Sequence, residues 1–345
     1  MLVRDVISAL ETLAHPELAE DWDNCGLQVG DPASETSGCL LALDMTVETV
    51  AETRKNGFAL LVVHHPALFR PLSRISPDVP CGQAIMAAIR VGVSVYAAHT
   101  SLDNAGDCGT PAALAAQLGL SPGPVLAPTA HPRSADSRLV MLTGEPGVVD
   151  ALLAECGLSH IPSTAWRVIG QAEGIQRIRV ELEVPEAEFQ GIAARAAKVG
   201  VRLTVLRPDE AGGPGGTGML VRVPPMSLAA LAEYVSRKMP AAPVRTAGRM
   251  EKTIETVALI PGSGGSLVEL AAARADALIT GECGYHDALR AEELGLGVVL
   301  AGHYDTERPV LNLLARRLQG QLGKDFAVGI SQARTDPFRA LQPDL

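Results

Sequence analysis

The sequence predicts an α/β protein with a main domain of strand–helix repeats around a largely parallel sheet, plus a smaller inserted α+β domain. Short apolar runs of strand length alternate with helical patterns up to about residue 125, and the alternation resumes in the C-terminal part. Two segments rich in Pro, Gly and Ser, at 121–137 and 208–217, interrupt it. We therefore assign 1–134 and 213–345 to a discontinuous main domain and 135–212 to the inserted domain.

The first half of the main domain opens with an amphipathic helix and then alternates strands with helices, as βαβ units do. The expected helices are at 2–14, 47–56, 82–91 and 111–118, and the expected strands are at 39–44, 59–63 and 93–98. The inserted domain doubles one strand–helix unit, which is compatible with a ferredoxin-like arrangement. Its strands are expected at 138–142 and 178–184, and its helices at 147–156 and 186–199. In the second half of the main domain, helices are expected at 226–238, 266–274, 285–294 and 309–322, and strands at 256–260, 277–280 and 297–301.

Composition excludes several classes of protein. The chain is 47% hydrophobic but only 3% aromatic, so its core must be built from Ala, Val and Leu. No apolar segment approaches the ~20 residues that cross a bilayer, and the N-terminus lacks the layout of a signal peptide, so we expect a cytoplasmic protein without membrane contact. The six cysteines form no C-x-x-C pair, which favours free thiols over a structural zinc site. A net charge of −10 without clustered basic residues disfavours nucleic-acid binding.

The most informative feature is the adjacent pair His64 and His65, which ends the apolar run 59–63 and precedes a proline. In α/β sheets, ligands bind beyond the carboxyl ends of strands, where loops converge. Side chains alternate along extended backbone, so the two imidazoles are expected to splay apart and could each hold a different metal ion.

Two further expected strands end in the same chemistry. His99 and Asp103 follow the strand at 93–98, and His303 and Glu307 follow the strand at 297–301. Histidine and carboxylate donors suit Zn, Mn, Fe or Co, and Glu307 or Asp103 could bridge two ions. Each residue alone is explained as well by a turn or a helix cap. The hypothesis of two divalent metal ions therefore depends on three strand ends repeating one ligand chemistry.

A glycine-rich turn, Gly262, Ser263, Gly264 and Gly265, follows a strand and opens a helix, so its N–H groups could bind a phosphate. It lacks the lysine of a P-loop, and a tight turn with positive φ explains it as well. The segment 21–26 and Asp44 are expected to line the same cleft. His99 and His286 are candidates for proton transfer, and His286 also for substrate contact, because histidine titrates in the working range.

Six motifs carry a family resemblance: DWDNCGLQVG at 21–30, VHHPALF at 63–69, AHTSLD at 98–103, GSGGS at 262–266, ITGECGYHDA at 279–288 and GHYDTE at 302–307. They resemble the NIF-three-like family, also labelled the GTP cyclohydrolase I type 2 homologues. The resemblance implies a dinuclear metal centre inside a toroidal homohexamer. Matched residue by residue, it implies the ligands His64, His65, Asp103, His303 and Glu307, with Glu307 as the bridge. It also implies an inserted domain similar to the PII/CutA ferredoxin-like fold.

The function expected from these features is a metal-dependent hydrolase acting on a nucleotide-like or phosphorylated small molecule. Two metal ions would lower the pKa of a bridging water and stabilise an oxyanion that develops on the substrate. The family label suggests a GTP cyclohydrolase I type 2-like reaction. The alternative is a ring-shaped metal-binding or regulatory scaffold without turnover.

Overall fold

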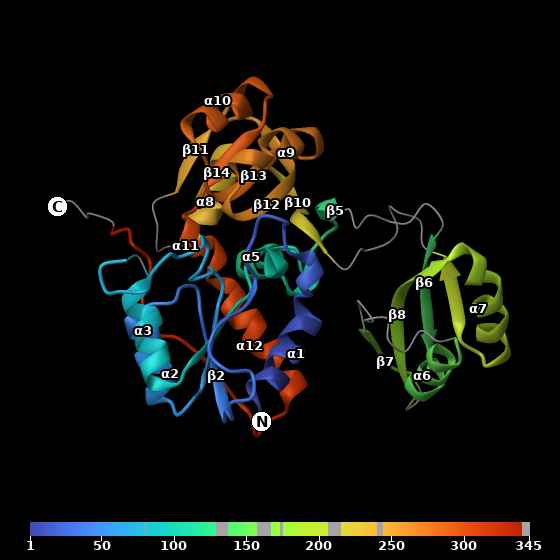
Figure 1. Cartoon of the computed structure of the whole chain (residues 1–345). Helices are drawn as coiled ribbons and strands as arrows, with labels where there is room; N and C mark the ends of the chain where they lie inside the picture. Colours follow the sequence, from blue (N-terminus) through green and yellow to red (C-terminus); the bar gives the residue numbers. More distant parts are fainter. Residues whose placement is uncertain are drawn as a thin grey trace, which may run out of the picture. The chain divides into compact units, whose positions relative to one another are not determined.

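The structure is a computed structural model that describes residues 1–79, 81–128, 137–156, 167–172, 175–205, 215–239 and 244–339. The chain divides into two compact units (Figure 1). The main unit comprises Met1–Pro128 and Gly215–Leu345, and the inserted unit comprises Thr129–Pro214. The expected domain boundaries at 134/135 and 212/213, and most of the break expected at 208–217, lie outside the described residues. Within those ranges, none of the helices combines the length and apolar content that a membrane crossing requires.

The first sheet of the main unit has five strands in the order β1-β4-β3-β2-β15. These are β1 (Gly26–Val29), β2 (Gly38–Ala42), β3 (Leu60–Val63), β4 (Ser94–Ala97) and β15 (Ala327–Ile330). All neighbours are parallel except the pair β1 and β4. The helices that pack on this sheet are α1 (Val3–Leu13), α2 (Val47–Lys55), α3 (Gly82–Val91) and α12 (Pro309–Leu322). Figure 1 shows α2 and α3 on one side of it and α1 and α12 on the other.

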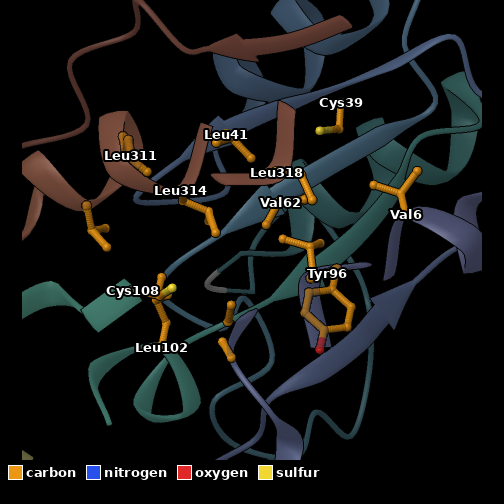
Figure 2. Close-up of a cluster of buried hydrophobic side chains, with 14 of the residues drawn as sticks. Val6, Cys39, Leu41, Val62, Tyr96, Leu102, Cys108, Leu311, Leu314 and Leu318 are labelled. Carbon is orange, nitrogen blue, oxygen red and sulfur yellow. The ribbon is translucent and has the colours of Figure 1, made fainter. Parts of the chain in front are cut away.

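Helices bury both faces of this sheet, and the side chains of each strand alternate between the two faces. Leu41, Val62 and Tyr96 point to the face covered by α1 and α12, and form the cluster in Figure 2. Their neighbours Leu61 and Val95 point the other way, into a cluster with α2 and α3. A sheet covered on both faces requires strands that are apolar throughout, and this is the pattern that predicted them.

The second sheet has six strands in the order β11-β14-β13-β12-β10-β5. These are β5 (Val125–Pro128), β10 (Gly216–Ser227), β11 (Arg245–Ala247), β12 (Thr253–Ser263), β13 (Ala277–Glu282) and β14 (Gly297–Leu300). The helices α5 (Thr110–Leu118) and α8 (Leu228–Lys238) bury one face. The helices α9 (Val268–Arg274) and α10 (Tyr285–Glu293) bury the other.

The main unit thus contains two mixed sheets rather than one largely parallel sheet. Only β12, β13 and β14 are mutually parallel in the second sheet, while β5, β10 and β11 pair antiparallel. The strand–helix pattern reveals strands joined by crossover helices, which are parallel. Strands that pair antiparallel and are reached through loops leave no such signal. One of them, β5, lies within 121–137, which the sequence predicted to be a break without structure.

Most expected helices are confirmed, and those at 82–91 and 309–322 have the predicted bounds. The helix expected at 226–238 begins later, at Leu228. Ser227 ends β10 instead, and its hydroxyl accepts a hydrogen bond from the N–H of Ala230, which caps the helix.

The inserted unit has a four-stranded antiparallel sheet in the order β7-β8-β6-β9. Its elements follow as β6 (Ser137–Gly144), α6 (Pro146–Glu155), β7 (Arg167–Ala172), β8 (Ile175–Pro185), α7 (Glu186–Lys198) and β9 (Arg202–Val205). Its own core includes Leu142, Leu152 and Ile192. The two predicted strand–helix units are present, and β7 and β9 are additional strands that the sequence pattern did not predict.

Candidate metal centre

The predicted ligands come together at the ends of strands from both sheets of the main unit. His64 and His65 follow β3 directly. His99 follows β4 and precedes the short helix α4 (Thr100–Asp103), which ends in Asp103. His303 and Glu307 begin and end the short helix α11 (His303–Glu307), which follows β14 of the second sheet. The site therefore joins the two sheets, which the sequence alone did not indicate.

Glu307 lies at the centre of the cluster and is only 4% exposed. Its Oε2 is 3.0 Å from His65 Nε2, and its Oε1 is 3.1 Å from His303 Nε2 and 3.7 Å from His64 Nε2. The two oxygens of one carboxylate thus face different imidazoles. His303 and Glu307 reach the same point because residues four apart lie on one face of a helix.

Asp103 approaches the same cluster through His64, whose Nε2 is 3.6 Å from Asp103 Oδ1. The hydroxyl of Thr110 donates a hydrogen bond of 2.6 Å to that oxygen and fixes the carboxylate. All five predicted ligands are therefore assembled, and the ring of His99 lies 5.2 Å from that of His64.

Each of the four histidines is held by its Nδ1 atom, which directs Nε2 inward. His64 Nδ1 is 2.9 Å from the carbonyl oxygen of Ala98. The other three face carboxylates, which we call the anchoring carboxylates: Asp44 at 2.8 Å from His65, Asp23 at 2.9 Å from His99 and Glu282 at 3.0 Å from His303. Metal-binding histidines are typically oriented by such a hydrogen bond from the ring nitrogen that does not bind metal.

Sequence reasoning placed Asp23 and Asp44 in the cleft but gave neither of them a role, and it missed Glu282. A signal was available, because Asp44 follows β2 closely and Glu282 is the last residue of β13. Both are carboxylates at carboxyl ends of strands, the rule that found the ligands themselves.

The donor atoms fit a metal ion. In the described part of the chain, the buried side-chain atoms without a hydrogen-bond partner are His64 Nε2, His65 Nε2 and Glu307 Oε2. The short contact between His65 and Glu307 is not aligned as a hydrogen bond. Buried polar atoms normally have a hydrogen-bond partner. Two imidazole nitrogens and one carboxylate oxygen that lack one and lie close together therefore indicate a site for a cation. Two overlapping groups can hold an ion, His64–His65–His99 and His65–His303–Glu307, each with ligand atoms within 4.8 Å of one another.

Electrostatics tie the imidazoles to their acidic partners. Burial alone would lower the pKa of His65, but the carboxylates of Asp44 and Glu307 outweigh it and raise that pKa to about 10. Glu307 likewise raises the pKa of His303 to about 9. Burial would raise the pKa of Glu307, yet the imidazoles of His303, His64 and His65 hold it well below its ordinary value. Protons therefore occupy, in the metal-free protein, nitrogens that a metal ion would take.

Gly262 is packed against this cluster with a φ of +68°. A Cβ atom there would lie 2.2 Å from Glu307 Oε1, so only glycine allows the close approach. The Gly262 N–H donates to the Thr306 hydroxyl, and the Gly264 N–H donates to the carbonyl oxygen of Glu282. These two N–H groups are thus engaged within the protein. Phosphate binding by the turn Gly262–Gly265 stays a prediction.

A cavity of about 430 Å³ adjoins the cluster. His99, Asp103 and Glu307 line it, together with Ser263 of the glycine-rich turn. His286 does not line it: it lies exposed in the first turn of α10, with its ring against that of Tyr285. The predicted role of His286 in proton transfer or substrate contact stays a prediction.

A family model for Duf34/NIF3 (NGG1p interacting factor 3) matches residues 1–337. The chain belongs to the Duf34/NIF3 family. This confirms the resemblance that the six sequence motifs carry, and the match extends over both sheets of the main unit and the inserted unit.

Relatives of this Duf34/NIF3 chain match it over nearly its whole length. Proteins named GTP cyclohydrolase 1 type 2 homolog from Mycobacterium bovis and Mycobacterium tuberculosis are each 30% identical over 369 residues, covering 97% of this chain and 96% of theirs. NIF3-like protein 1 of Rattus norvegicus is 27% identical, with 99% and 93% covered. The crystal structure of a Bacillus cereus protein related to NIF3 has a TM-score of 0.75 at 26% identity, with 99% of both chains covered.

Proposed function

We propose that this chain is a metal-dependent hydrolase with a dinuclear centre of divalent ions, acting on a nucleotide-like or phosphorylated small molecule. One observation carries the proposal: four imidazoles are held at Nδ1, and unpaired donor atoms of two of them meet an unpaired oxygen of Glu307. An arrangement that leaves buried donors unsatisfied is costly unless a ligand satisfies them.

The proposed ligands are those implied by the family resemblance: His64, His65, Asp103, His303 and Glu307. One fact supports two ions rather than one. The two oxygens of Glu307 face different imidazoles, as a bridging carboxylate requires. When bound, divalent ions lower the pKa of a coordinated water and stabilise negative charge that develops on a substrate. Zn, Mn, Fe and Co all accept these donors.

His99 is the proposed proton-transfer residue. Its Nδ1 is 2.9 Å from Asp23, which also accepts hydrogen bonds from the N–H and hydroxyl of Thr100. The pKa of Asp23 is held below its ordinary value, since His99 and Thr100 outweigh the effect of burial. An ionised Asp23 orients the ring, so His99 is positioned to transfer a proton into the cavity it lines.

The proposal extends to the assembly. In the inserted unit, a β-α-β-β-α-β order with strands arranged β7-β8-β6-β9 favours a ferredoxin-like fold. The homohexamer is proposed on the family resemblance, and light scattering of the purified chain tests it.

The names of the mycobacterial relatives support hydrolysis as the reaction class for this chain.

Metal content per chain is the first test. We expect about two divalent ions in the wild type and a sharp loss in His65→Ala and Glu307→Ala. His286→Ala, which removes an exposed histidine outside the cluster, is the matched control and should keep its metal. Full metal content in Glu307→Ala would contradict the proposed centre.

Turnover is the second test. Metal-loaded protein is assayed against a panel of phosphoesters, amides and nucleotides, with His99→Gln as the variant. We expect hydrolysis of at least one class, which falls roughly 10²–10⁴-fold in the variant while metal content is retained. A fully loaded protein that hydrolyses nothing in the panel would favour the scaffold alternative instead.

A further inference from the structure

The cavity beside the histidine cluster has an aromatic wall. Trp22 and Phe69 are 62% and 47% exposed, and their rings stand edge to face with centroids 6.1 Å apart. The His99 ring completes the group, 6.3 Å from Trp22 and 6.2 Å from Phe69. All three rings line the cavity. The chain has only two tryptophans and five phenylalanines, so an exposed pair at the mouth of a cavity calls for an explanation.

The rest of the lining suits the face and the edge of a flat ring. Ile260, Pro261 and Leu267, from the end of β12 and the turn that follows, supply apolar surface. Ser263 and Ser266 supply hydroxyls that make no hydrogen bond to any residue the structure describes, so both remain available to polar atoms of a ligand. A cavity of about 430 Å³ is in the lower part of the size range of small-molecule sites.

The charge of the lining disfavours a polyanion. Among the described residues, no Lys or Arg lines the cavity, whereas the carboxylates of Glu20, Asp103 and Glu307 do. The three anchoring carboxylates lie behind the histidines. These six carboxylates outnumber the four positive charges of two divalent ions. A triphosphate chain would bring further negative charge without a cationic side chain to receive it.

We propose that this cavity binds a planar nitrogen heteroaromatic ring, as a free base or a nucleoside, stacked on the face of one of the two rings, Trp22 or Phe69, and against the edge of the other, with its polar edge at Ser263 and Ser266. Phosphate groups contribute nothing to its affinity. The inference rests on the proposed function, because the ring is held beside the metal site and would be the part of the substrate that the chain recognises.

The test is calorimetric titration of the metal-loaded full chain with guanosine, adenosine, GTP and ribose 5-phosphate. We expect at least one nucleoside to bind, GTP to bind no tighter than guanosine, and ribose 5-phosphate not to bind. Trp22→Ala and Phe69→Ala should each weaken nucleoside binding roughly 5- to 150-fold, the range of base–aromatic stacking, and Trp22→Phe should restore most of it. The matched control is Phe338→Ala, which removes a 73% exposed phenylalanine that does not line the cavity.

Any one of three results overturns the proposal. Neither nucleoside binds, Trp22→Ala binds nucleoside as tightly as the wild type does, or ribose 5-phosphate binds as tightly as guanosine. Metal content and turnover, measured on the same samples, separate this inference from the proposed function. Nucleoside binding that depends on Trp22 in a protein without turnover would overturn the hydrolase only. Metal-dependent turnover unaffected by Trp22→Ala and Phe69→Ala would overturn the stacking only.

Discussion

Replacing Gly262 with alanine tests how closely the glycine-rich turn packs against the candidate metal centre. The new Cβ would lie 2.2 Å from Glu307 Oε1 and 3.4 Å from His303 Nε2. Ordinary van der Waals contacts of a Cβ atom are 3.4–4 Å, so the Glu307 carboxylate must move by about an ångström or more. This movement separates Glu307 from the imidazoles that it faces at 3.0 and 3.1 Å.

Two effects add to the cost of Gly262→Ala. An L-residue at a φ of +68° is strained by about 1–2 kcal/mol. Loss of a charge-assisted contact at the buried carboxylate costs about 1.5–3 kcal/mol more. We expect the free energy of unfolding to fall by about 2.5–5 kcal/mol and metal affinity to fall at least ~100-fold, because the proposed bridging ligand is displaced.

Gly92→Ala is the matched control for this experiment. Gly92 ends α3 with a φ of +69°, but a Cβ there meets no atom within 4 Å. The Gly92→Ala variant should therefore lose only the free energy of the backbone strain, about 1–2 kcal/mol, and its metal content should equal that of the wild type. Chemical denaturation and elemental analysis of both variants make the comparison. Equal stability losses and full metal content in both variants would refute the packing of Gly262 against Glu307.

Two other predictions concern the surroundings of the site, and a third concerns the cysteines. Asp44→Asn removes the anion that orients His65, so metal affinity measured by competition with a chelator should fall about 10–100-fold, and an unchanged affinity would deny Asp44 this role. Because the pKa values of His65 and His303 are raised to about 10 and about 9, protons compete with the metal, so affinity should increase from about pH 6 to about pH 9; a pH-independent affinity would contradict this. Burial raises the pKa of Cys39 to about 12, whereas Cys81 is exposed, so a thiol reagent followed by mass spectrometry should modify Cys81 in the native protein and Cys39 only after unfolding.

The elements of the main unit that sequence predicted best are those whose signal is local. The strands β2, β3, β4, β13 and β14 are short apolar runs, buried on both faces, and each is followed or preceded by a helix. The proposed ligands were predicted in the same way, because each lies in the loop or short helix that follows such a strand. For both inferences, the periodicity of apolar residues and the Gly or Pro residues nearby are sufficient. Neither inference required knowledge of which strands pair.

The tertiary structure decided which strands are neighbours and how the ligands are held. β5, β10 and β11 pair antiparallel through contacts distant in sequence, so no local pattern marks them. The three anchoring carboxylates reach their histidines across gaps of 21 to 76 residues, and that proximity exists only after neighbouring strands of a sheet have paired. The sequence by itself therefore determined the donor types and the strand ends that carry them. Folding alone decided their orientation, because it depends on atoms brought together from distant parts of the chain.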